Sequence, residues 1–336
     1  MKILIVSGFL GSGKTTFIKE LLRRTGIRPV VMENEYGENN IDALNLQQSQ
    51  PTDGEMKILE FMEGCVCCTM KDSFVNSVLT VFSGLEPDYL IVEPTGVGKL
   101  SSILENLKPV LHDGITMLRP VVVLSPQSYR QNMAEWPELY RDQVINAQIV
   151  VFSKSEHLPA DILKRFASQI HELNPKAQIV QEHYSTKDDE WWRQLADLPA
   201  ENHVIIGETG QGRPFSQISL SSAGLSNPAE LVQILEDCLR GEFGHIVRAK
   251  GIVPVGAENL RFDLADQLYA ITGSAEEKCQ CVFIGGDLDE EKLCQRMGTT
   301  LLTEEYGMPG NYFRAKRLRR ERKAGQGKTG KNITFR

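Results

Sequence analysis

The chain has 336 residues, enough to bury a sizeable core and to form two domains. Charged residues make up 24% and hydrophobic residues 41%, and the formal net charge of −7 argues against a general polyanion binder. No apolar run approaches the roughly 20 residues that span a bilayer, and three of the seven cysteines are crowded into four positions. We therefore expect no membrane segment, no disulfide framework and a reducing cytoplasm.

Strand and helix patterns alternate through the first part of the chain. This alternation predicts an α/β fold, a P-loop NTPase domain with a mostly parallel sheet flanked by helices. The pattern fades after Gln181, and a Gly-rich stretch at 207–214 ends the domain, which we assign to residues 1–213. We expect strands at residues 2–7, 28–34, 57–61, 88–93, 115–124, 147–153 and 177–181, and helices at 14–24, 70–83, 136–146 and 161–173.

Residues 8–15, GFLGSGKT, follow the first expected strand, precede the first expected helix and fit the phosphate-loop pattern G-x-x-x-x-G-K-[ST]. Glycines allow successive backbone N–H groups to point at phosphates, and the helix N-terminus adds positive potential. Lys14 is expected to neutralise the β/γ-phosphates and the Thr15 hydroxyl to bind Mg²⁺. The candidate nucleotide-binding residues of this segment are Gly8, Gly11, Ser12, Gly13, Lys14, Thr15 and Thr16.

The second expected strand is followed by an acidic loop, ENEYGENNID at residues 33–42. P-loop GTPases place nucleotide-dependent switch loops at this point. Glu35, Glu38 and Asp42 are candidates for contacting Mg²⁺, positioning the attacking water or helping to ligate a transition metal. A merely solvated acidic loop is the alternative.

A cysteine cluster, Cys65, Cys67 and Cys68, lies in the loop after the third expected strand. Three thiolates favour Zn²⁺, Cu⁺ or a similar thiophilic ion. Closed structural zinc sites usually have four ligands, so this cluster favours an exchangeable site. Buried thiols and a redox cluster remain as alternatives. We interpret the other cysteines of the second half, Cys238, Cys279, Cys281 and Cys294, as small core residues.

The strand expected at 88–93 ends in Glu93, and Gly96 follows three residues later. A carboxylate at that strand end can hold Mg²⁺ directly or through water, and Gly96 can sense the γ-phosphate. The alternative is a helix-capping acid in an ordinary turn. His112 is a further candidate ligand, although a lone histidine is more often incidental.

The base-recognition segment is expected after the buried strand at 147–153. Guanine presents neighbouring N–H donors that a carboxylate accepts, and the usual solution is Asn-Lys-x-Asp. Here Ser153, Lys154 and Glu156 occupy those positions. This altered motif favours GTP over ATP while weakening the expected selectivity.

The remaining chain predicts a smaller α+β module, assigned to residues 214–310. Short turns between its strands favour antiparallel pairing. We expect helices at residues 229–240 and 289–297 and strands at 245–255, 259–264, 267–272 and 279–286. Residues 311–336 form a basic tail, with ten Lys or Arg against one acid from Arg314 onward, which we expect to be mobile.

These segments together resemble the CobW-like metal-associated GTPases, relatives of the hydrogenase and urease nickel-insertion GTPases. The resemblance rests on GFLGSGKTT, ENEYGENNID, EGCVCCT, IVEPTG and SKSE, with HIVRAKGIV and VFIGGDLDEEKL farther on. It implies a slow GTPase that delivers Zn²⁺, Co²⁺ or Ni²⁺ to a client metalloenzyme or cobalamin-pathway protein. It also implies metal ligation by the three clustered cysteines with help from Glu35 and Glu38.

The candidate catalytic residues are Lys14, Glu93 and Glu38, although the sequence does not rank Glu35, Glu38 and Glu93 for positioning the water. The cysteine loop lies between the acidic loop and the Glu93 strand. We therefore expect γ-phosphate contacts to order both loops, so that metal and GTP tighten each other's binding.

Three other functions are consistent with the sequence. They are a G-protein chaperone of a cobalamin enzyme with structural cysteines, an ATP-dependent kinase, and a metal-responsive regulator whose basic tail touches nucleic acid. We do not expect the protein to bind membranes or, on the main interpretation, nucleic acid. A homodimer is left open.

Overall fold

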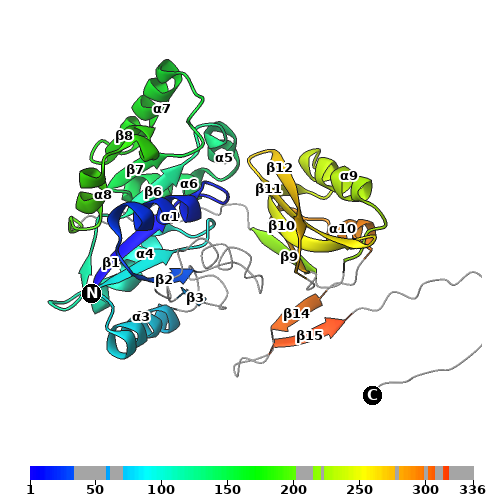
Figure 1. Cartoon of the computed structure of the whole chain (residues 1–336), viewed down its shortest axis with the longest axis horizontal. Helices are drawn as coiled ribbons and strands as arrows, with labels where there is room; N and C mark the ends of the chain where they lie inside the picture. The colour runs from blue at the N-terminus through cyan, green and yellow to red at the C-terminus, as the bar shows by residue number, and fades with distance from the viewer. Residues whose placement is uncertain are drawn as a thin grey trace, which may run out of the picture.

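The structure is a computed structural model of the chain, shown in Figure 1. It describes residues 1–33, 58–60, 71–201, 215–220, 223–276, 280–298, 302–306 and 313–317. Side chains are described throughout these segments except at 58–60, 71–73, 302–306 and 313–317.

The first part of the chain forms a parallel sheet in the strand order β3-β2-β4-β1-β6-β7-β8, with the short β5 also paired to β1. Neighbouring residues of β1 are buried against opposite cores, Ile3 and Ile5 on one face and Leu4 and Val6 on the other. Burial on both faces explains why these strands are continuous apolar runs. The strands are β1 (Lys2–Ser7), β2 (Val30–Glu33), β3 (Ile58–Glu60), β4 (Tyr89–Glu93), β5 (Thr116–Met117), β6 (Val121–Leu124), β7 (Ile149–Phe152) and β8 (Gln178–His183).

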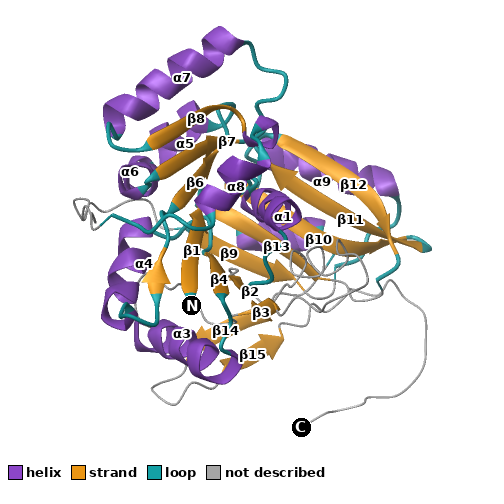
Figure 2. Cartoon of the chain, turned by 60° about the vertical axis from the view of Figure 1, so that its left-hand side comes forward, coloured by secondary structure: helices purple, strands orange, loops and turns teal. Residues whose placement is uncertain are grey.

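Helices cover both faces of this sheet (Figure 2). One face carries α3 (Lys71–Leu85), α4 (Leu100–Leu107), α5 (Tyr129–Glu135), α6 (Pro137–Asn146) and α7 (Ala160–Leu173). The other face carries α1 (Lys14–Thr25) and α8 (Asp189–Leu195). Two short 3₁₀ turns, η1 (Lys108–Val110) and η2 (Tyr184–Thr186), complete this part.

A second, antiparallel sheet follows in the order β12-β11-β10-β13-β9. Two helices, α9 and α10, pack on one of its faces. A separate pair, β14 (Leu302–Tyr306) and β15 (Phe313–Arg317), is also antiparallel. The bounds are β9 (Ser216–Leu220), α9 (Pro228–Leu239), β10 (His245–Val255), β11 (Glu258–Ala265), β12 (Leu268–Ser274), β13 (Gln280–Gly286) and α10 (Glu290–Arg296).

The predicted fold class is confirmed: a parallel sheet flanked by helices is followed by an antiparallel α+β unit. The predicted boundary at residue 213 lies outside the described residues, as does the tail beyond Arg317. Phe313–Arg317, which the sequence analysis assigned to that tail, forms β15.

Several details differ from the sequence prediction, among them β9 and β14, which were not predicted. The single strand expected at 115–124 is divided into β5 and β6, because Arg119 and Pro120 separate them and proline cannot donate to a ladder. The helical pattern also continues beyond Gln181 into α8, whose N-cap Asp188 accepts from the Trp191 N–H at 2.8 Å. The short helices α4 and α5 were not predicted.

The interpretation of the isolated cysteines is confirmed for those that the structure describes. Cys238 of α9, Cys281 of β13 and Cys294 of α10 form no disulfide and are buried in one core. Burial raises the pKa of the Cys238 thiol to about 12, so this group is protonated at neutral pH and a poor nucleophile. Cys279 lies outside the described residues.

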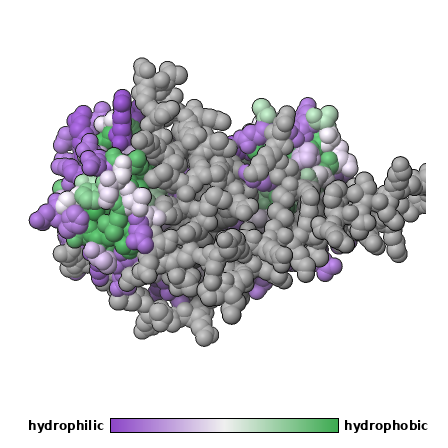
Figure 3. Space-filling model, turned by 90° about the horizontal axis from the view of Figure 1, so that it is seen from below, coloured by the Kyte–Doolittle hydropathy of each residue, from purple (hydrophilic) through white to green (hydrophobic). Residues whose placement is uncertain are grey.

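In the part of the chain that the structure describes, no helix is both long and apolar enough to cross a bilayer. Some apolar surface is nevertheless exposed: Leu79 and Leu85 of α3 are 36% and 38% exposed. Figure 3, which views the molecule from below, shows apolar side chains gathered on one side between hydrophilic neighbours.

Candidate functional site

The loop between β1 and α1 has the backbone of a phosphate cradle. Gly8, Gly11 and Gly13 have φ values of 142°, 71° and 90°, which other residues rarely adopt. A Cβ on Gly8 would also lie 2.3 Å from the carbonyl oxygen of Val123 in β6. These glycines therefore permit both the curvature of the loop and its close packing on the neighbouring strand.

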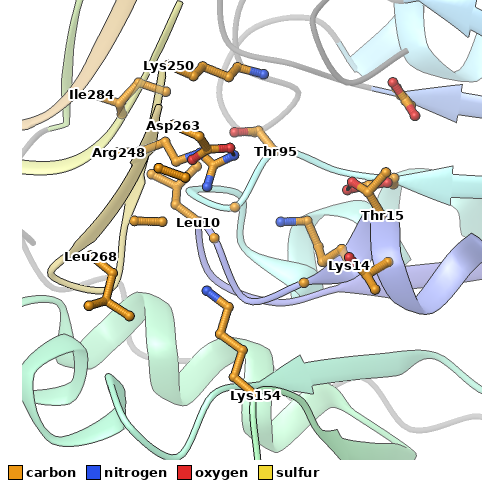
Figure 4. A pocket seen from close by; sticks show the side chains of 18 of the residues that line it. Leu10, Lys14, Thr15, Thr95, Lys154, Arg248, Lys250, Asp263, Leu268 and Ile284 are labelled. Atoms are coloured by element: carbon orange, nitrogen blue, oxygen red, sulfur yellow. Dashed lines mark hydrogen bonds and ion pairs between the residues drawn. The ribbon is translucent and has the colours of Figure 1, made fainter. Parts of the chain in front are cut away.

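A cavity of about 500 Å³ opens over this loop (Figure 4), a size typical of small-molecule sites. Its floor is the loop and the start of α1, and its walls come from the ends of β2 and β4, from Lys154 after β7, and from the antiparallel sheet. The predicted residues that line it are Gly11, Gly13, Lys14, Thr15, Thr16, Glu93, Gly96 and Lys154.

Lys14 is positioned inside the loop rather than in solvent. It is 8% exposed, and its Nζ donates to the carbonyl oxygens of Gly8 and Phe9 at 3.2 and 3.3 Å. Its ammonium group is therefore held at the centre of the cradle, where phosphate oxygens are expected to bind.

The two groups predicted to hold Mg²⁺ lie together at the cavity. The Thr15 hydroxyl donates to Glu93 Oε1 at 2.9 Å, and both residues line the cavity. A hydroxyl and a carboxylate are oxygen donors of the kind that Mg²⁺ prefers, and Mg²⁺ sites commonly use one or two protein ligands together with phosphates. This pair therefore fits the ion.

A second acidic residue, Glu33, lies at this corner of the cavity. It ends β2, is 4% exposed, and is paired in register with Glu93 of β4 and with Glu60 of β3. Carboxyl ends of parallel strands share one edge of the sheet, which places these three strand-end positions side by side. The sequence analysis missed Glu33, although it shares with Glu93 its position as the last residue of a buried strand.

The loop after β4 packs directly on the phosphate loop. A Cβ on Gly96 would lie 2.3 Å from the backbone nitrogen of Leu10. Gln143 of α6 fixes the same loop by donating its side-chain Nε2 to the carbonyl oxygens of Gly96 and Gly98, at 3.2 and 3.1 Å. Because Gln143 lies far away in sequence within an ordinary helix, no sequence signal indicated this role.

The three residues of the predicted base motif do not act together in the structure. The Ser153 hydroxyl donates to the backbone carbonyl of Ser12 at 2.5 Å, so it braces the phosphate loop. Lys154 lines the cavity but is ion-paired with Asp266, at the turn between β11 and β12. Glu156 lies 3.1 Å from His183 Nε2, and neither Glu156 nor Ser153 lines the cavity.

An aromatic cluster supports the phosphate loop from behind. Phe9 is 1% exposed and packs against Trp136 and Tyr140, with ring centroids 5.6 and 5.8 Å apart. Trp136 in turn stacks on Phe215, just before β9, at 4.7 Å, and contacts His245 of β10 at 5.2 Å. The phosphate loop and the antiparallel sheet are therefore packed through one cluster.

The predicted transition-metal residues cannot be placed. Cys65, Cys67, Cys68, Glu35 and Glu38 lie outside the described residues, together with Asp42. Among the described residues no group of three or more His, Cys, Asp or Glu side chains is arranged to hold a metal ion. His112 is exposed, and its Nδ1 accepts from the Gly114 N–H at 3.0 Å.

The strand–loop–helix cradle with its buried lysine and Thr15–Glu93 pair defines a P-loop nucleotide-binding protein. Comparison with protein families makes this more specific. A model described as the CobW/HypB/UreG nucleotide-binding domain matches residues 2–181, and one described as the cobalamin synthesis protein cobW C-terminal domain matches residues 215–301. The chain belongs to the CobW/HypB/UreG family.

Several curated relatives are similar to this chain. A zinc chaperone CobW of Pseudomonas aeruginosa is 27% identical over 347 residues, covering 90% of this chain and 92% of that protein. The zinc chaperone YeiR of Escherichia coli is 30% identical over 203 residues, covering 58% of this chain and 60% of YeiR, which is less than two thirds of that relative. The solved structure of Zn(II)-bound YjiA GTPase from E. coli has 18% identity and a TM-score of 0.43, covering 89% and 98% of the two chains.

Proposed function

We propose that the protein is a GTP-binding and GTP-hydrolysing metallochaperone that carries a thiophilic or transition metal ion, with zinc as the first candidate. The observation that carries the nucleotide half is the Thr15–Glu93 pair beside the buried Lys14 in one cavity. The relatives named zinc chaperones support the metal half.

In the proposed complex the phosphates lie over the loop of residues 8–15. Backbone N–H groups and the α1 N-terminus bind phosphate oxygens, and Lys14 neutralises charge on the β- and γ-phosphates. Thr15 and Glu93 would hold Mg²⁺, which when bound neutralises the charge that develops on the phosphates. We assign the positioning of the attacking water to Glu93 or to Glu35 and Glu38 of the acidic loop.

The metal cargo is assigned to Cys65, Cys67 and Cys68, with Glu35 and Glu38 as further ligands. The topology supports a connection between the two sites. Glu33 lines the cavity and pairs in register with Glu60 of β3, and Cys65 follows Glu60 by five residues. Five residues of chain span at most about 18 Å from Cα to Cα, which limits how far apart the cysteine segment and this sheet edge can be.

The experiment that tests this function is a zinc titration of the reduced full chain in three nucleotide states. We expect the highest zinc affinity with a non-hydrolysable GTP analogue, a lower one with GDP, and a reciprocal tightening of the analogue by zinc. Cys67→Ala is expected to abolish high-affinity zinc binding without changing nucleotide affinity in the absence of zinc. Equal zinc affinity in all three states would contradict the coupling.

The proposal also includes the protein that receives the metal and the preference for one nucleobase. We assign a client metalloprotein, in a reducing compartment such as the cytoplasm that keeps the thiolates available. Because Glu156 is paired with His183 outside the cavity, an ATP-dependent activity is the second candidate. Competition between GTP and ATP for the wild-type chain decides between them.

A further inference from the structure

The cavity over the phosphate loop is walled by the antiparallel sheet, on the face opposite α9 and α10. Ala249, Phe262 and Leu264 face the helices and join their core. The alternating residues of β10 and β11 point to the opposite face of the sheet, as strand geometry requires. These alternating residues, Arg248, Lys250, Asp263 and Ala265, all line the cavity.

This wall contacts the phosphate loop at Gly11. A Cβ on Gly11 would lie 2.7 Å from the Cβ of Ala265 and 3.5 Å from Nη1 of Arg248. In Figure 4 the Arg248 side chain lies beside Leu10, and the ammonium group of Lys14 lies across the same cavity. The guanidinium of Arg248 is therefore positioned at the rim of the phosphate cradle.

Arg248 is held in this position by its neighbour. Its Nη2 donates to Asp263 Oδ2 at 2.9 Å, and its side chain is only 16% exposed. Asp263 belongs to β11 and Arg248 to β10, where Arg248 pairs in register with Ala265. The ion pair fixes one edge of the planar guanidinium group, which carries five N–H donors. Its Nη1 atom is the nitrogen that lies toward Gly11.

We propose that Arg248 is a catalytic residue that donates hydrogen bonds to the γ-phosphate of bound nucleotide, so that the antiparallel sheet supplies an activating arginine to the P-loop site of its own chain. This inference rests on the proposed GTPase function. In the reaction, the oxygen of a water molecule forms a bond to the γ-phosphorus while the bond from that phosphorus to the β–γ bridging oxygen breaks. The electron pair stays on GDP, and the proton of the water passes to the released phosphate.

Arg248 exchanges no proton in this step, because a guanidinium stays protonated. It stabilises the negative charge that develops on the transferring group and on the bridging oxygen. Arginines in this role contribute on the order of 10³–10⁵ to kcat in P-loop GTPases. Because Arg248 comes from the second sheet, hydrolysis would proceed only while that sheet is seated on the phosphate loop.

The test is single-turnover hydrolysis of GTP by the full chain, together with nucleotide affinities. We expect Arg248→Ala to lower the hydrolysis rate by at least about 100-fold while the Kd for GDP changes by less than about threefold. Arg248→Lys is expected to recover part of the rate, since it keeps the charge but loses the planar fork. The matched control is Arg240→Ala, which removes one arginine from an exposed position after α9.

A second readout does not depend on turnover. Wild-type protein is expected to bind GDP with aluminium fluoride, a mimic of the transferring phosphoryl group, at least about tenfold more tightly than GDP alone, and Arg248→Ala is expected to lose this gain. Circular dichroism and unfolding curves show whether Arg248→Ala folds. If it does not fold, the same measurements are made with Arg248→Lys and Arg248→Gln.

The outcomes separate this inference from the proposed function. If the wild type hydrolyses GTP and Arg248→Ala keeps both the hydrolysis rate and the affinity for GDP with aluminium fluoride, the role of Arg248 is overturned. The proposed GTPase function then stands. A wild-type chain that neither hydrolyses GTP nor tightens with aluminium fluoride would overturn both. An equal loss of GDP and GTP affinity in Arg248→Ala, with no change in rate, would make Arg248 an ordinary phosphate-binding cation and would also overturn the inference.

Discussion

The phosphate end and the base end of the cavity differ in how far they are prepared for a nucleotide. At the phosphate end, Lys14 lies inside a glycine-rich cradle and Thr15 is already paired with Glu93. At the base end, Lys154 is ion-paired with Asp266, and Glu156, just outside the cavity, contacts His183. Phosphate binding can therefore use an existing arrangement, whereas base recognition requires Glu156 to exchange partners.

The two ends therefore obtain their specificity for the nucleotide in different ways. The phosphate end depends on the backbone conformation of one loop and on the Thr15–Glu93 pair that folding brings together. The guanine recognition that we propose would depend on Lys154 and Glu156, whose present partners come from the β11–β12 turn and from β8. Substitutions at Gly96, Trp136, Glu156 and Glu20 are expected to have successively smaller effects on nucleotide binding.

The largest effect on nucleotide binding is expected at Gly96, where the loop after β4 meets the phosphate loop. In Gly96→Ala the new Cβ would lie 2.3 Å from the Leu10 backbone nitrogen, so one backbone has to move. We expect a loss of nucleotide affinity or hydrolysis on the order of 100-fold, measured by titration and single-turnover kinetics. Gly84→Ala on α3, where a Cβ meets nothing within 4 Å, is the control, and equal behaviour of the two variants would contradict a preformed phosphate end.

Trp136→Ala tests the support behind the cradle. Trp136 is 4% exposed and contacts both Phe9 and Phe215, so its removal leaves a cavity. We expect the free energy of unfolding to fall by about 3 kcal/mol or more, with weaker nucleotide binding, in denaturation and titration experiments. The control is Trp191→Ala on α8, which is expected to reduce stability while leaving nucleotide affinity unchanged. If both variants bind nucleotide normally, the aromatic cluster does not support the cradle.

Glu156→Gln addresses the base end. If Glu156 leaves His183 to accept the guanine donors, the preference for GTP over ATP is expected to fall about tenfold, because an amide cannot accept both N–H groups. His183→Ala removes the competing partner and is expected to tighten GTP only about two- to threefold, in keeping with the small value of partly exposed polar pairs. Competition binding gives both ratios, and an unchanged preference in Glu156→Gln would assign base selection to another residue.

The smallest effect is expected at Glu20, on α1 beyond the cradle. Hydrogen bonds from Arg23 and Arg24 lower the pKa of Glu20 to about 2, from an ordinary value of 4.5. A lowered folded-state pKa stabilises the protein above pH 4.5, and this contribution is lost as the pH falls toward 2. Because solvent screens these arginines, Glu20→Gln is expected to cost less than about 1 kcal/mol at pH 7.

Denaturation curves at pH 7, 4 and 3 check this dependence. The difference between wild type and Glu20→Gln is expected to shrink steadily toward the lowest pH, with nucleotide affinity unchanged throughout. A difference that grows as the pH falls would have the wrong sign for a carboxylate held by arginines.

Much of the fold could be predicted from the sequence because its signals are local. The apolar run before Gly8, the glycine spacing and the stripe on α1 define one strand–loop–helix unit, and short turns define the antiparallel sheet. The division of the 115–124 segment and the short helices α4 and α5 could not be predicted as easily. They depend on Pro120 and on packing against α6, which local periodicity does not report.

The candidate site divides in the same way. The phosphate-loop residues and Glu93 could be found from sequence, because the chemistry requires them at fixed spacing on known elements. Three other residues could not be found from sequence, because only the packing of distant elements brings them to the site. Arg248 and Lys250 line the cavity, and Gln143 holds the loop after β4. Asp266 likewise reaches Lys154 across 112 positions of sequence.

The close approach of Gly11 to Ala265 constrains how this protein can diversify. A larger side chain at either position would push the phosphate loop and the antiparallel sheet apart. A change at one position therefore requires a compensating change at the other. Chimeras that exchange the C-terminal sheet between relatives are therefore expected to keep nucleotide turnover only when the residues at positions 11 and 265 are transplanted as a compatible pair.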